Sequence, residues 1–182
     1  MSTSRRAGLQ MIDLRLGQAG EQIDGIVARV RDGHGLVNGR TFWRIDALRA
    51  HEARVRGRVR QVREAGQAAW TECSAQLRRE LLELETQIAI STARLDADVA
   101  IGDAAFVSAV QAELDAWAAY LHAAASTQRA ELEDCLAVAR SQLAEFRDAA
   151  ASAAVRLRVS QAIEDLDRAA AQDCASVQKT HK

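Results

Sequence analysis

No proline occurs anywhere in the 182 residues of this chain. Average usage of about 5% would give roughly nine, and proline is the residue that most often breaks helices and opens turns. Alanine, the strongest helix former, occurs 38 times. Aromatic residues make up only 4% of the chain, although large rings usually help to fill a compact core. The chain is therefore predicted to be all-α, with long helices and few turns.

An apolar stripe of helical period predicts a first helix over residues 9–32. Its members recur at steps of three and four residues, as in a heptad pattern: Leu9, Ile12, Leu16, Ala19, Ile23, Ile26 and Val30. Three glycines within it each cost about 1 kcal/mol relative to alanine, so this helix is expected to need a partner. The glycine-rich segment DGHGLVNGR, residues 32–40, ends the helix.

The same spacing continues through residues 42–101, which predicts one helix about 90 Å long. Its stripe comprises Ile45, Leu48, Glu52, Val55, Val59, Val62, Gly66, Trp70, Cys73, Leu77, Leu81, Leu84, Ile88 and Leu95. A third helix is predicted over 104–178, with a second capping site at Ser126–Thr127 that could split it. Its stripe comprises Val107, Val110, Leu114, Trp117, Leu121, Leu132, Cys135, Ala139, Leu143, Phe146, Ala150, Ile163 and Leu166.

The best turn signal lies at Gly102-Asp103, because glycine suits the end of a helix and aspartate caps the next one. Asp96 and Asp98 indicate that the turn begins earlier. A short turn makes successive helices antiparallel. The predicted fold is a long antiparallel coiled-coil hairpin, with a shorter N-terminal helix packed at its base. The predicted division is residues 1–40, an amphipathic helix and glycine-rich loop, and residues 41–182, the hairpin.

Five arginines fall within ten positions of the second helix: Arg54, Arg56, Arg58, Arg60 and Arg63. In a helix they flank a stripe of valines, so the run forms basic shoulders beside an apolar seam. The simplest interpretation is a solvated helix face laced with salt bridges. The functional alternatives are a site for an acidic protein partner and a phosphate-binding patch for nucleic acid. Phe42 and Trp43, beside the glycine-rich segment, either pin the first helix to the base of the hairpin or form an exposed anchor for a partner.

No pattern of catalytic, metal-binding or cofactor-binding residues was found in the sequence. The four histidines have no second ligand at helical spacing, and the three cysteines lack the C-x-x-C pairs of zinc sites. We therefore expect a non-enzymatic protein without a cofactor. The sequence shows no signal peptide and no membrane-spanning stretch, and an odd number of cysteines fits a reducing compartment. A cytoplasmic location is expected.

A proline-free antiparallel hairpin of this length resembles the FliJ/YscO class of type III secretion and flagellar export proteins. The resemblance is one of architecture over most of the chain and carries over no individual residue. It implies a cytoplasmic stalk or escort protein, whose hairpin sits at the centre of a hexameric export ATPase and also contacts chaperones.

Two other functions stay open. One is a nucleic-acid-associated binder that uses the basic run Arg40–Arg63. The other is a self-assembling scaffold or membrane-surface coat, in which residues 9–32 form the surface helix. Because a two-helix rod leaves half of its apolar seam uncovered, a homodimer or an obligate protein partner is expected.

Overall fold

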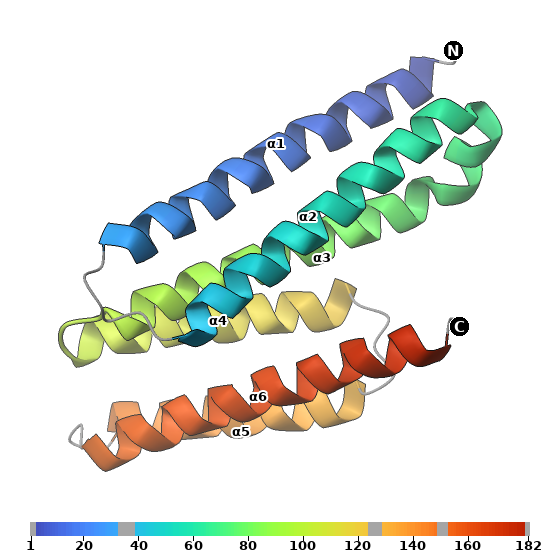
Figure 1. Ribbon diagram of the computed structural model, residues 1–182. Helices are drawn as coiled ribbons and strands as arrows, with labels where there is room; N and C mark the ends of the chain where they lie inside the picture. The colour runs from blue at the N-terminus through green and yellow to red at the C-terminus, as the bar shows by residue number, and fades with distance from the viewer. Residues whose placement is uncertain (1–2, 33–38, 124–128, 149–152, 181–182) are drawn as a thin grey trace. The chain divides into compact units, whose positions relative to one another are not determined.

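The computed structural model describes residues 3–32, 39–123, 129–148 and 153–180. Within these ranges the chain forms six α-helices (Figure 1): α1 (Thr3–Asp32), α2 (Gly39–Ala65), α3 (Gln67–Asp98), α4 (Asp103–Ala123), α5 (Arg129–Asp148) and α6 (Ala153–Thr180). The described ranges contain no strand, so the predicted all-α class is confirmed.

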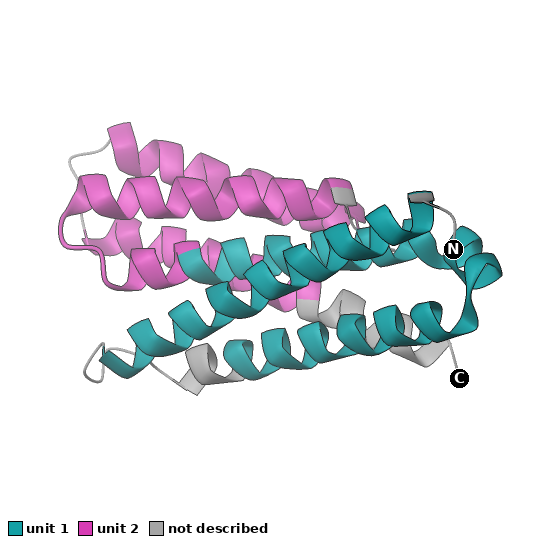
Figure 2. Cartoon of the chain, turned by 90° about the horizontal axis from the view of Figure 1, so that it is seen from above, with its two compact units in different colours: residues 1–92 teal, residues 93–182 magenta. Residues whose placement is uncertain are grey.

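The helices group into two compact units, residues 1–92 and 93–182, shown in different colours in Figure 2. The boundary between them falls inside α3. Unit 1 holds α1, α2 and most of α3, and unit 2 holds the end of α3 with α4, α5 and α6. These units do not test the predicted division into residues 1–40 and 41–182, which stays a prediction.

A single glycine divides the helix that was predicted over residues 42–101. Gly66 has a φ of +92°, a left-handed conformation that only glycine adopts without strain. The chain reverses there, because Arg58 of α2 pairs with Glu80 of α3 and His51 lies 2.9 Å from Gln87. As numbers fall along α2 they rise along α3, so the two helices are antiparallel. The prediction of one continuous 60-residue helix is wrong.

Helix α1 runs antiparallel to α2, since Arg63 pairs with Asp13 and Arg49 pairs with Asp24. All seven residues of its predicted stripe are buried. Its length of 30 residues exceeds the 27 of α2, and its polar contacts extend along α2 rather than sitting at one end. The prediction of a shorter helix at the base of a hairpin is therefore also wrong. Helix α1 buries its stripe within unit 1, and its need for a partner stays a prediction.

The predicted turn near residues 102–103 is confirmed. Helix α3 ends at Asp98, and α4 begins at Asp103, so the turn starts earlier, as the aspartates indicated. Gly102 has a φ of +88°, and its carbonyl oxygen accepts a hydrogen bond from the Phe106 N–H at 3.2 Å.

The helix predicted over residues 104–178 is divided into α4, α5 and α6. The predicted split at Ser126–Thr127 itself lies outside the described residues, but α4 ends and α5 begins on either side of it. The division between α5 and α6 was not predicted. The sequence there, DAAASAA at residues 148–154, favours continuous helix by propensity. Folding back instead lets α5 and α6 bury their apolar faces, which include Leu143, Phe146, Val159 and Ile163.

Arginine side chains from other helices cap the C-terminal ends of several helices. The Arg129 guanidinium, at the start of α5, donates to the Leu121 carbonyl in the last turn of α4. Arg156 of α6 donates to the Ala100 carbonyl just beyond α3 at 3.3 Å, and its guanidinium lies 4.3 Å from the centre of the Phe106 ring. The last carbonyls of a helix have no partner within the helix, and a cation is favourable at that end.

The reversal at Gly66 predicts the sign of a stability change. Gly66→Ala should lower the free energy of unfolding by about 1 to 2 kcal/mol, because alanine is strained in the left-handed region. Gly57→Ala is the matched control. Gly57 lies inside α2 with nothing within 4 Å of an added Cβ, so alanine should raise stability by up to about 1 kcal/mol. Urea unfolding followed by circular dichroism measures both. Stabilisation by Gly66→Ala would contradict the reversal and favour the continuous helix.

Candidate interaction surface

The five predicted arginines lie together on α2, and those with printed contacts face two different edges of that helix. We call Arg54, Arg56, Arg58, Arg60 and Arg63 the α2 basic surface. Between them Val55, Val59 and Val62 are buried, so the predicted pattern of an apolar seam with basic shoulders is confirmed. The side chains of Phe42 and Trp43 lie outside the described residues, and their role as partner anchors stays a prediction.

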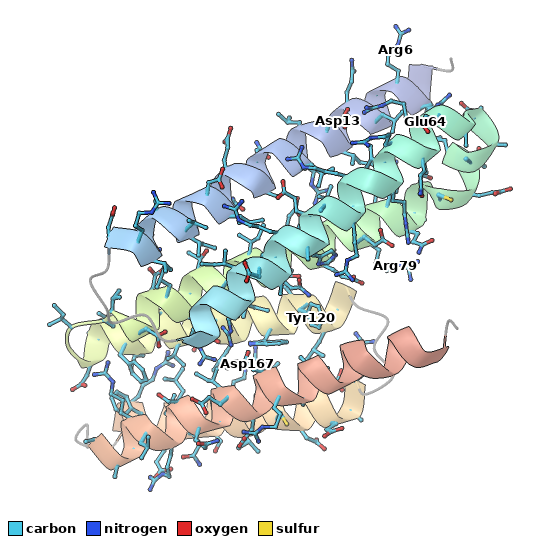
Figure 3. All side chains as sticks on the ribbon, viewed as in Figure 1. Arg6, Asp13, Glu64, Arg79, Tyr120 and Asp167 are labelled. Atoms are coloured by element: carbon cyan, nitrogen blue, oxygen red, sulfur yellow. The ribbon has the colours of Figure 1, made fainter. Side chains whose placement is uncertain are left out.

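Arg56 and Arg63 face α1. The Arg63 guanidinium lies 2.6 Å from the Asp13 carboxylate, whose residue is labelled in Figure 3. Arg56 donates to Glu52 in its own helix at 2.6 Å and to the Leu16 carbonyl of α1 at 3.3 Å. Both arginine side chains are about half exposed, and pairs of this kind contribute only about 0 to 1 kcal/mol each. This edge therefore orients α1 more than it stabilises it.

Arg58 and Arg54 lie toward α3. Arg58 pairs with Glu80. Partial burial raises the pKa of the Glu83 carboxyl above its usual value, and the neighbouring Glu80 raises it further, while Arg79 and Arg54 oppose the shift. Arg79 is labelled in Figure 3. Arg54 thus acts electrostatically on Glu83 of α3 and forms no ion pair there among the described residues.

Arg54 and Arg60 are the exposed members of the α2 basic surface that have no ion pair within the described part of the chain. Residues 40–63 hold eight arginines against two acids, an excess of six positive charges. Three acids from α1 and α3, namely Asp13, Asp24 and Glu80, pair with arginines of this segment. Arg54 and Arg60 add exposed positive charge that these pairs do not compensate.

Arg5 caps the C-terminal end of α2, and this role was not predicted from the sequence. Its side chain is buried, and its guanidinium donates to the Arg63 carbonyl at 2.6 Å and toward the Val62 carbonyl at 3.5 Å. These carbonyls belong to the last turn of α2, where cations are favoured. The only sequence signal was a cation three or four residues before an apolar stripe, which is common on solvated helices.

Trp70 packs against α1 where Gly8 leaves room for it. A Cβ added to Gly8 would overlap the indole ring, and Trp70 is buried. The prediction that Trp70 belongs to the core is confirmed. On the same side of α1, Arg15 pairs with Glu85 of α3; that hydrogen bond raises the pKa of Arg15, against the opposing effect of partial burial.

His51 is a core residue. It is 8% exposed, and Nδ1 lies 2.9 Å from the Gln87 side-chain oxygen. Burial lowers the pKa of His51 below the usual value for histidine; the hydrogen bond to Gln87 and the charge of Glu80 oppose this, and Arg54 adds to it. Within the described ranges, no three histidine, cysteine, aspartate or glutamate side chains gather closely enough to hold a metal ion.

A buried ionic cluster joins three helices in unit 2. Glu113 of α4 is fully buried, and both of its carboxylate oxygens accept hydrogen bonds from Arg94 Nε at 2.9 Å. Arg94 Nη2 also lies 3.2 Å from Asp167 of α6. Burial alone would lower the pKa of Arg94, but the carboxylates of Glu113, Asp167 and Asp98 raise it. A buried charge held in this way fixes the register of its helices.

The cluster was not predicted, although one signal was present. Glu113 lies three residues after Val110 and four before Trp117, so it occupies the apolar stripe of its helix. A charge at such a position needs a buried partner. The sequence does not show that the partner is Arg94, because that contact depends on how the helices are arranged. Trp117 is confirmed as a core residue, and its ring stacks edge-on with Tyr120 at 5.6 Å.

Cys73 and Cys135 are free thiols of intermediate exposure, and burial raises the pKa of Cys135. Neither feature distinguishes these cysteines from ordinary thiols beside a helical core.

Comparisons with known proteins gave no match to any family model, curated protein or solved structure. None of the described helices combines the length and the apolar character that crossing a bilayer would require.

The lowered pKa of His51 predicts how stability changes with pH. Below about pH 6.5, the usual histidine value, the unfolded chain takes up a proton that folded His51 resists. The free energy of unfolding should therefore fall as the pH drops below 6.5, until folded His51 itself is protonated. His51→Gln should remove this part of the dependence in urea titrations, whereas the exposed His122→Gln should retain it. Identical pH profiles for wild type and His51→Gln would contradict the assignment.

Loss of Glu113 should be costly because it leaves Arg94 with a buried, poorly compensated charge. Glu113→Leu is expected to lower the free energy of unfolding by about 3 to 5 kcal/mol. Asp115→Asn in the same helix is the matched control. Asp115 pairs with Arg140 at 3.7 Å on an exposed surface, and its loss should cost no more than about 1 kcal/mol. Calorimetry that gives equal losses would rule out a structural role for the cluster.

Proposed function

We propose that this chain is a non-enzymatic helical protein that works by protein–protein contact, and that the α2 basic surface binds an acidic protein partner. The observation that carries the proposal is the surplus of positive charge on α2. Arg54 and Arg60 are exposed without an ion pair among the described residues, on a segment of eight arginines and two acids. Complementary charge speeds association and selects partners.

A protein partner fits the α2 basic surface better than nucleic acid does. Its cations lie on two edges of one helix, and most of them already contact groups of α1, α2 or α3. Sequence-independent nucleic-acid sites combine a positive groove with aromatic side chains on which bases stack, and no aromatic residue lies between Trp43 and Trp70 in the sequence.

The specific form of the proposal is a stalk or escort component of a bacterial type III secretion ATPase. That role was inferred from a hairpin of helices about 60 residues long. The longest helix among the described residues has 32 residues, so the architecture supports the general function more strongly than the particular partner. A hexameric export ATPase remains a defined partner to test.

The proposal predicts that binding depends on the two unpaired arginines. Arg54→Gln/Arg60→Gln should weaken binding to an acidic partner by tenfold or more, since each exposed charge contributes on the order of 1 kcal/mol at low salt. Arg140→Gln/Arg147→Gln in α5 makes the same change of charge and should leave binding unchanged. The partner is first captured with the tagged chain under nuclease treatment, then purified and titrated.

A labelled DNA duplex tests the alternative directly. Under the proposal, the duplex should bind no more tightly to the wild type than to the Arg54→Gln/Arg60→Gln variant at physiological salt. Tight duplex binding that disappears with this variant and with rising salt would overturn the proposal in favour of a nucleic-acid role.

A further inference from the structure

Helix α1 covers one edge of the α2 basic surface. It buries its apolar stripe within unit 1, and its polar groups meet three arginines of α2. Asp13 pairs with Arg63 at 2.6 Å, and Asp24 pairs with Arg49 at 3.1 Å. The Leu16 carbonyl accepts from Arg56. An acidic edge on α1 thus occupies positions that an acidic partner of α2 would need.

The glycines of α1 lower its helix propensity, and at two of these positions no neighbouring atom requires a residue without a side chain. Helix α1 holds four glycines, whereas α3, α4, α5 and α6 hold none. Gly17 and Gly25 are exposed, and an added Cβ at either would meet nothing within 4 Å. Alanine would fit at both and would favour the helical state by about twofold to fivefold at each position. Gly8 differs, because Trp70 fills the space of its missing Cβ.

Although α1 buries its apolar stripe, its low helix propensity and its exposed ion pairs with α2 favour the opening of α1 before the rest of its unit. Its release would uncover the face of α2 that packs against α1, together with Arg49, Arg56 and Arg63. The uncovered surface is an apolar stripe with one basic edge. Its complement is a helix with an apolar stripe and acids about eleven residues apart on one edge, the spacing of Asp13 and Asp24.

We propose that α1 is a displaceable, autoinhibitory helix, and that the partner which replaces it on α2 is an amphipathic helix with an acidic edge. This inference rests on the proposed function, and it specifies the partner's chemistry and the regulation of the same surface. The partner gains the apolar contacts of α1 as well as its ion pairs, which surface charge alone would not supply.

The test uses the full chain and a fluorescent synthetic peptide with the sequence of residues 3–32 as probe. Peptide binding should be weakened about fivefold to thirtyfold by Gly17→Ala/Gly25→Ala in the chain, because these changes hold the chain's own α1 in place. Gly8→Ala in the chain should strengthen peptide binding, because the added methyl group overlaps Trp70 and weakens the packing of the chain's own α1. The sequences of α2 and α3 are unchanged, and the peptide keeps its glycine at this position. A peptide carrying Asp13→Lys/Asp24→Lys should bind less well than the unaltered peptide.

Hydrogen exchange supplies a readout that does not depend on the peptide or on Gly8→Ala. Amides of α1 should exchange through an opening that leaves α2 and α3 protected, and Gly17→Ala/Gly25→Ala should slow this exchange while that of α5 is unchanged. Exchange of α1 only together with α2 and α3, or peptide binding insensitive to Gly17→Ala/Gly25→Ala, would overturn displacement. The Arg54→Gln/Arg60→Gln comparison does not involve α1, so the proposed function can fail or stand separately.

Discussion

The left-handed backbone at Gly66 is the constraint on which unit 1 depends. Two helices of 27 and 32 residues meet at this one residue, and its positive φ turns what would be a rod into an antiparallel pair. The reversal brings Glu80 to Arg58 and Gln87 to His51. It also brings α2 and α3 together as a pair that α1 contacts through Asp13, the Leu16 carbonyl and Arg15. Without it, Arg5 would have no exposed helix end to close, and Trp70 would not lie over Gly8.

In this proline-free chain, arginine side chains stabilise several helix ends and one buried carboxylate. Arg5, Arg129 and Arg156 each donate to carbonyls at or just beyond the end of another helix, and Arg94 holds the buried carboxylate of Glu113. The planar guanidinium, with its several donors, suits both tasks. An abundance of arginine is therefore only in part a sign of a binding surface. Arg54 and Arg60 are the candidates for binding because they form neither kind of contact among the described residues.

The sequence was sufficient to identify most of the buried apolar residues but not the buried charges, nor which residues they meet. The stripe of α1 was predicted completely, and most stripe residues of the later helices are also buried. The errors came at Gly66, where the steps from Val62 to Gly66 to Trp70 keep helical spacing across a turn. Periodicity reports the buried face of a helix, and a turn that preserves the spacing is invisible to it. The contacts of Arg5, and the pairing of Arg94 with Glu113, depend on tertiary arrangement and could not be read from local pattern.

The distance across Gly66 tests the account most directly. Nitroxide labels at Ala53→Cys and Arg79→Cys, both exposed sites, would be measured by pulsed electron paramagnetic resonance after Cys73, Cys135 and Cys174 are replaced by alanine. Antiparallel packing of α2 and α3 places the two backbones about 15 Å apart. A continuous helix over the same 26 residues would place them about 39 Å apart. A short distance supports the reversal and the surface built upon it, and a distance near the longer value would contradict both.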